Sequence, residues 1–214
     1  MQPPTPSPIE NVFAMSEPQH MLSKLLWEID GLMQSQSVWI ENETFPTPIF
    51  RAWNTAVTAW HITDWLWSSK AQARSKMATV HGFVYEETAT GIRRGLEKFQ
   101  EAVATRERSL YICREIANGS KHMRRTKSDP DVKAKAVWRE AIARVGLAVP
   151  GDLVLSLEIT DGETTKDAVR WFIDGFGYWE NLFINNDWVS TQMRLPDKII
   201  KMGRLKDANV KGPT

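Results

Sequence analysis

Three polar side chains at regular spacing make the stretch Cys113–His122 the part of this sequence best suited to chemistry. Arg114, Asn118 and His122 follow one another at intervals of four residues. On a helix they therefore drift by only about 40° per step and form one stripe. Arginine binds phosphate oxygens in pairs, and histidine transfers protons near neutral pH. The stripe fits a site that binds a phosphate and acts on it.

The same residues also fit an ordinary polar helix end. Asn118-Gly119 would then stop the helix, and Lys121 and His122 would complement the negative end of its dipole.

Lys121 opens a short basic stretch that continues through Arg124 and Arg125. These cations, together with Asn118, would hold a nucleic-acid backbone electrostatically. The stretch ends at Ser128-Asp-Pro130, a composition typical of an exposed turn.

A second polar group lies in the segment Trp60–Trp65. His61 and Asp64 are three residues apart, so they share a helix face. A histidine beside a carboxylate serves as a general base, as a metal-binding pair or as a buried hydrogen-bonded couple. Because tryptophans flank the pair, we expect both side chains to face the interior, with Asp64 bound to a cation or histidine of the third helix. The sequence has no Glu-x-x-His pair, and we expect neither a metal nor a cofactor.

Four long helices are expected to position these residues. Apolar residues at intervals of three and four predict helices over residues 16–33, 47–68, 91–119 and 168–183. Residues 71–90 are poorly defined, apart from a possible turn at 77–85.

The apolar period changes after residue 150. Leu153, Leu155, Leu157 and Ile159 alternate with smaller or polar residues, and Asp161-Gly162 follows directly. Alternation that ends in Asp-Gly predicts a β-hairpin, with a short returning strand over 163–166. Residues 131–149 fit either a helix or a strand.

These elements predict a mainly α fold: a four-helix bundle of the up-and-down type, with a small β-hairpin inserted before the last helix. The bundle would be a single domain over 16–190, and the hairpin would occupy about 152–167. Residues 1–15 are expected to be a disordered, proline-rich tail, and residues 191–214 a basic, mobile one.

Composition narrows the class of protein. The net charge is +1, so no overall positive field draws the chain to nucleic acid or to a membrane. The single cysteine fits a reducing compartment, and no apolar run approaches the length of a membrane span, so we expect a cytoplasmic protein. No P-loop, G-x-G-x-x-G, G-x-S-x-G or H-E-x-x-H motif occurs. The ten tryptophans are expected mostly to fill the core between helices.

Near the end of the third long helix, an arginine is followed by a polar residue and then by a histidine. This order of residues resembles that of the HEPN superfamily of helical-bundle ribonucleases and toxins of phage-defence systems. Arg114, Glu115 and His122 carry the resemblance, which covers residues 16–125. It implies a homodimer and metal-independent cleavage of RNA by Arg114 and His122, with Glu115 at the polar position. Six residues separate Glu115 from His122, at the long end of the family's spacing, and Gly119 is expected to break the helix between them.

The competing hypothesis is a non-enzymatic helical interaction module, such as an inhibitor, an adaptor or a prophage accessory protein. Tryptophans and methionines would then form the surface for a protein partner, an antitoxin or another complex subunit. His61, Asp64, Asn118 and His122 would form one buried polar network that sets the register of the helices. Burial separates the two hypotheses, because catalysis needs Arg114 and His122 to open onto a basic cleft.

Overall fold

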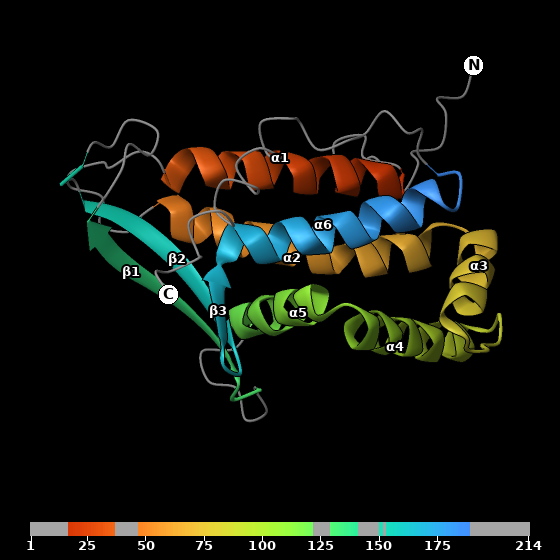
Figure 1. Cartoon of the computed structure of the whole chain (residues 1–214). Helices are drawn as coiled ribbons and strands as arrows, with labels where there is room; N and C mark the ends of the chain where they lie inside the picture. Colours follow the sequence, from red (N-terminus) through yellow and green to blue (C-terminus); the bar gives the residue numbers. More distant parts are fainter. Residues whose placement is uncertain (1–16, 37–46, 122–128, 141–149, 152, 189–214) are drawn as a thin grey trace, which may run out of the picture.

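The computed structural model describes residues 17–36, 47–121, 129–140, 150–151 and 153–188. Within these ranges the chain is mainly helical, with a small antiparallel sheet (Figure 1). The elements are α1 (Pro18–Gln36), α2 (Thr47–Ser69), α3 (Ala71–His81), α4 (Ala89–Arg106), α5 (Arg108–Lys121), β1 (Val132–Glu140), β2 (Leu153–Asp161), β3 (Thr164–Asp167) and α6 (Ala168–Ile184). The tails predicted at 1–15 and 191–214 lie outside the described residues.

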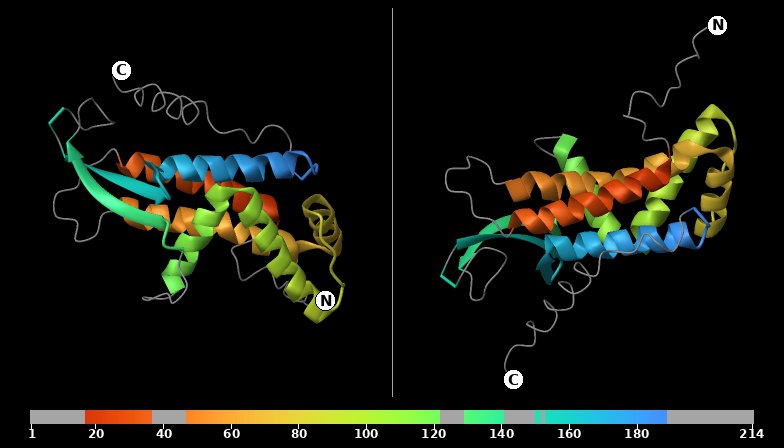
Figure 2. Two further views of the ribbon diagram at one scale, coloured as in Figure 1. Left: turned by 60° about the horizontal axis from the view of Figure 1, so that its bottom comes forward. Right: turned by 90° about the horizontal axis from the view of Figure 1, so that it is seen from above.

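Helix α2 lies at the centre of the fold. It contacts every other helix and strand β2, and Figure 2 shows α1, α2 and α6 side by side. Its buried face is rich in small and β-branched residues, and the buried hydroxyls of Thr55 and Thr63 donate to the carbonyls of Arg51 (2.7 Å) and Trp60 (2.8 Å). These two buried hydroxyls are thereby satisfied within the helix.

Three buried tryptophans join distant elements, as predicted for the large aromatic residues. Trp179 of α6 donates its indole N–H to the carbonyl of Ala59 in α2 (2.9 Å), and Trp67 of α2 donates to Ile92 in α4 (2.7 Å). Trp171 of α6 donates to a carbonyl of β2 (3.2 Å). Each indole fills the core and also satisfies its single donor.

Helices α4 and α5 replace the single helix predicted over 91–119. The backbone leaves the helical conformation at Glu107, where φ is −129° and ψ is 101°. The Glu107 carboxylate accepts from the backbone N–H (3.1 Å) and the hydroxyl (2.7 Å) of Ser109, so it caps the first turn of α5. Buried Val103 and Leu110 keep a helical spacing across the break, which is why the apolar pattern did not reveal it.

The helix end predicted at Asn118-Gly119 is wrong. Helix α5 continues through both residues to Lys121. The described glycines with positive φ are Gly82, Gly151 and Gly162, and a Cβ built on Gly119 meets no heavy atom within 4 Å. Gly119 therefore keeps ordinary helical geometry and does not act as a stop.

Strands β2 and β3 form the hairpin that the sequence predicted. β2 ends at Asp161, β3 begins at Thr164, and Gly162 between them has a φ of 57°, in the left-handed region that favours glycine. β1 adds a third strand, which pairs antiparallel with β2 along all nine of its residues. Of the two alternatives for 131–149, the strand is correct for 132–140, and 141–149 lie outside the described residues.

The prediction of four helices is too low for the described residues, which contain six. One extra helix comes from the break at Glu107. The other is α3, whose buried residues are Met77, Ala78 and His81. Three buried positions in eleven residues leave too short an apolar stripe for the sequence to show. Among the described helices, none is both long enough and apolar enough to cross a membrane.

Candidate functional site

Arg114 is half-buried on α5 and lies against two aromatic rings. The centre of its guanidinium is 4.6 Å from the ring centroid of Tyr111 and 5.8 Å from that of Trp60 in α2. One nitrogen donates to Glu101 of α4 (3.0 Å), and Nε lies 3.8 Å from the carboxylate of Glu115. The side chain is 21% exposed. Arg114 is thus packed by aromatic carbon and faces two carboxylates.

Arg108, one residue after the break, ties α5 to the sheet. Its Nε and Nη2 donate to the two carboxylate oxygens of Asp161 at the end of β2 (2.9 and 2.6 Å). Nη2 also donates to Asp129 (3.3 Å), and the guanidinium lies 4.2 Å from the ring centroid of Tyr111. The bidentate bond to Asp161 is the main cause that raises the pKa of Arg108.

Asp129 joins the two arginines. It accepts from the Tyr111 hydroxyl (2.9 Å) and from the backbone N–H of Asp131 (2.9 Å), and its own N–H donates to Glu115 (3.2 Å). The Asp131 N–H and the Tyr111 hydroxyl lower the pKa of Asp129. Burial and this same hydroxyl bond raise the pKa of Tyr111. Tyr111 therefore stays protonated as a donor, and Asp129 stays ionised as an acceptor.

These seven side chains form a continuous set of contacts, which we call the α5 polar network. Its members are Glu101, Arg108, Tyr111, Arg114, Glu115, Asp129 and Asp161. Two guanidiniums face four carboxylates, so the network as described is more negative than positive. Its bonds link α4, α5 and the end of the sheet at the β2–β3 turn, so the network holds all three together.

The structure brings together only part of the predicted phosphate site. Arg114 and Glu115 belong to the network, and Asn118 is half-buried on the next turn of α5. Lys121 is the last residue of α5, and its side chain lies outside the described part. His122, Arg124 and Arg125 also lie outside the described residues, so the pairing of Arg114 with His122 stays a prediction.

His61 and Asp64 are both half-buried on α2. Asp64 accepts from the amide of Gln100 in α4 (3.3 Å), and the same amide donates to the hydroxyl of Thr63 (3.2 Å). Gln100 belongs to the segment expected to form the third helix, but it is an amide, and the pairing of Asp64 with a cation or histidine stays a prediction. In the described part of the chain, no three histidine, cysteine or carboxylate side chains are grouped as metal ligands.

Sequence reasoning missed Arg108 and Tyr111, although α5 carries a signal for both. Arg108, Tyr111 and Glu115 recur at intervals of three and four, on the helix face next to Arg114. Counting back from Arg114 in steps of three would have found them. Asp129 and Asp161 gave no such signal, because each lies in a segment that the sequence identified only as a turn.

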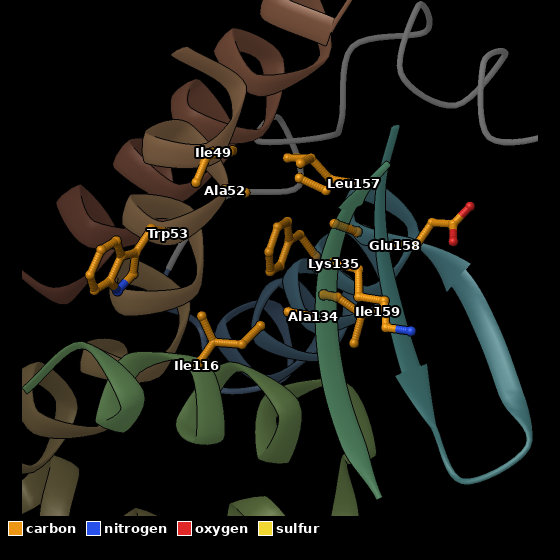
Figure 3. Close-up of a pocket in the computed structure, with 12 residues that line it drawn as sticks. Ile49, Ala52, Trp53, Ile116, Ala134, Lys135, Leu157, Glu158 and Ile159 are labelled. Carbon is orange, nitrogen blue, oxygen red and sulfur yellow. The ribbon is translucent and has the colours of Figure 1, made fainter. Parts of the chain in front are cut away.

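A second feature is an apolar pocket of about 200 Å³ between α2, α5, α6 and the inner face of the sheet. Figure 3 shows Ile49, Ala52 and Trp53 of α2 on one side and strands β1 and β2 on the other. The remaining lining residues are Ile116, Ala134, Lys135, Ala136, Leu157, Glu158, Ile159, Ala168 and Phe172. The charged ends of Lys135 and Glu158 point away from the pocket, so its interior is apolar (Figure 3).

Comparisons with protein-family models, with curated proteins and with solved structures found no match to this chain. The α5 polar network and the apolar pocket are the two candidate functional features of the described residues.

Proposed function

We propose that this protein is a non-enzymatic helical interaction module that binds a protein partner, as an inhibitor or adaptor does. The observation that carries the proposal is the state of Arg114, which is packed on two rings and paired with two carboxylates. A catalytic arginine directs its N–H donors at substrate oxygens, whereas Arg114 donates to Glu101, lies beside Glu115 and packs its guanidinium against two rings of its own chain.

The α5 polar network supports this role, because networks of this kind fix the relative position of elements. Its bonds between Arg108 and Asp161 join residues 53 apart in the chain. We further propose that α1, α2, α5 and α6 make up a four-helix, up-and-down bundle, since each contacts two or more of the others. The network would then attach the sheet to this bundle in one orientation.

Exposed tryptophans support a partner surface. Trp53, 39% exposed, lies at the apolar pocket, and Trp27 of α1 is 67% exposed. Tryptophan contributes large contact areas and is enriched at interfaces between proteins.

A second candidate function is the metal-independent cleavage of RNA by Arg114 and His122, in a toxin or defence protein. One observation favours it: Glu101, which faces Arg114, is itself 70% exposed. Such surface pairs contribute only about 0.2–1 kcal/mol, so a phosphate would displace Glu101 at little cost. Arg114 would then stabilise the developing negative charge, while His122 transfers the proton of the attacking 2′-hydroxyl.

This second candidate requires a dimer. Residues eight apart on one helix are separated by about 12 Å along its axis. Because α5 runs on through Gly119, a bend there does not bring His122 back towards Arg114. The partner's copy of the histidine would have to complete the site across a two-fold axis, so the ribonuclease would be a homodimer.

One experiment separates the two functions. Purified wild-type protein, Arg114→Ala and His122→Ala are incubated with total RNA, with and without EDTA. The interaction module leaves the RNA intact in every case. Cleavage that survives EDTA and is lost in both variants would overturn the proposal and establish the ribonuclease.

A stability measurement tests the structural role of Arg114 directly. Arg114→Ala should lower the free energy of unfolding by about 1–3 kcal/mol, because it leaves the half-buried Glu115 without that cation. Arg93→Ala, at an exposed position of α4, is the matched control and should change it by less than about 0.5 kcal/mol. An Arg114→Ala protein as stable as the control would contradict the structural role.

A further inference from the structure

Strand β1 is an edge of the sheet and stands beside the apolar pocket. The strand order is β1-β2-β3, so no strand of the described residues pairs with the outer edge of β1. An edge strand presents a row of N–H and C=O groups that can pair with another extended chain. Figure 3 shows β1 next to the pocket, with α2 across from it.

The two faces of β1 differ in chemistry. On the inner face, Ala134 and Ala136 line the pocket, and their small side chains leave space above buried β2 residues. On the outer face, Lys133, Lys135 and Arg139 are all exposed, and Arg139 pairs with Glu158 of β2. A chain added beside β1 would therefore meet an apolar pocket on one side and the exposed Lys133 and Lys135 on the other.

The cations argue against a second copy of this chain as the occupant. Antiparallel pairing of β1 with its own copy places Lys133 opposite Arg139 when all nine residues pair. A shift of two residues in one direction or the other places Lys135 opposite itself or opposite Arg139. Like charges directly opposite each other on neighbouring strands destabilise the pairing.

We propose that β1 binds an extended segment of a partner protein as a fourth strand, and that this segment alternates apolar and acidic side chains. The proposal rests on the interaction module proposed above and names its docking site. Main-chain hydrogen bonds to β1 supply affinity, and the alternate side chains supply specificity. The apolar side chains enter the pocket beside Trp53, and the acidic ones lie over Lys133 and Lys135.

The proposal is tested by selecting binders from a displayed library of random nine-residue peptides, one position for each residue of β1. The enriched peptides should alternate acidic and apolar residues. A synthetic copy of the most enriched peptide should slow amide hydrogen exchange within residues 132–140. Peptides without this alternation, no enriched peptide at all, or protection confined to other segments would each overturn the proposal.

Two variants and a control test the chemistry of the two faces. Lys133→Glu/Lys135→Glu should weaken binding of the selected peptide by about tenfold, because two attractive cross-strand pairs become repulsive. Ala136→Trp, which fills the mouth of the pocket, should weaken it as well. Arg93→Glu on α4, a charge reversal far from β1, should leave the affinity unchanged. Equal affinity for all of these proteins would overturn the site.

The outcome also distinguishes this site from the proposed function. Cleavage of RNA by the wild-type protein would overturn the proposed interaction module itself. Intact RNA together with a failed peptide selection would overturn only the proposed β1 site. A wild-type protein that sediments as a dimer, and becomes a monomer in Lys133→Glu/Lys135→Glu, would instead assign β1 to a second copy and overturn the proposal.

Discussion

His81 is a buried titratable residue that joins two helices at the end of α3. Its Nδ1 lies 2.9 Å from the carbonyl of Met77, and its Nε2 lies 2.9 Å from the hydroxyl of Tyr178 in α6. A neutral ring satisfies both contacts when Nδ1–H donates to Met77 and Nε2 accepts from Tyr178. Burial lowers the pKa of His81 and raises the pKa of Tyr178 to about 12. The pair is therefore stable in its uncharged form.

The lowered pKa of His81 predicts a loss of stability in acid. Below the ordinary histidine pKa of 6.5, His81 binds a proton in the unfolded chain but stays neutral in the folded chain. The free energy of unfolding should therefore fall as the pH drops through 6.5, and urea unfolding between pH 8 and pH 5 measures it. His81→Gln should lessen this dependence, whereas His20→Gln serves as the control. An unchanged slope in His81→Gln would contradict the prediction.

At the scale of elements, the break at Glu107 decides how α5 meets the rest of the fold. Figures 1 and 2 show α4 and α5 as separate helices, and the chain changes direction between them. A Cβ built on Gly175 of α6 would approach Leu110 Cδ2 to 3.0 Å, so α5 packs closely on α6 just after the break. The cap at Glu107 thus sets both the start of α5 and its contact with α6.

Removing this cap should destabilise the fold. Glu107→Ala takes away the acceptor of the Ser109 N–H and hydroxyl, and such caps contribute about 0.5–2 kcal/mol. Chemical unfolding of the variant measures the loss. Glu97→Ala, at an exposed position within α4, keeps both helices capped and should be nearly neutral. Equal stability of the two variants would argue against the cap.

Two glycine substitutions should change the stability of the fold in opposite directions. Gly119→Ala lies within α5 with open space around it, and alanine in a helix is more stable than glycine by about 0.5–1 kcal/mol. Gly162→Ala must hold a positive φ in the hairpin turn, at a cost of about 1–2 kcal/mol. Thermal unfolding of both variants measures the two effects. Destabilisation by Gly119→Ala would instead favour a helix break at that residue.

At the scale of the whole molecule, one core runs from α1 through α2 to α6 and the inner face of the sheet. Cys113, the only cysteine of the chain, is fully buried in this core on α5, and burial raises the pKa of its thiol. The thiol therefore reports on opening of the core, since it reacts only as an exposed thiolate.

The native protein should react slowly with a disulfide reagent such as DTNB. The reaction rate should rise with urea in parallel with global unfolding, because local fraying does not expose the centre of α5. The same thiol in guanidinium-unfolded protein provides the reference rate. Fast reaction under native conditions would show that α5 leaves the core more easily than its contacts indicate.

The sequence by itself determined part of the local structure, but not α3 or the division into α4 and α5. Helices α1, α2 and α6 follow from apolar periods of three and four, and the hairpin turn at Gly162 follows from alternation ending in Asp-Gly. These signals lie within single segments, so they can be recognised without knowledge of the rest of the fold. The break at Glu107 escaped because the buried positions keep their spacing across it.

Only the tertiary structure decided what Arg114 does. Its spacing from Asn118 and His122 predicted a phosphate site, but its contacts include Glu101 of α4 and Trp60 of α2. Asp161, a turn residue in the sequence, became the bidentate partner of Arg108. Contacts between residues far apart in the chain leave no periodic signal, because packing of the elements selects them and local propensity does not.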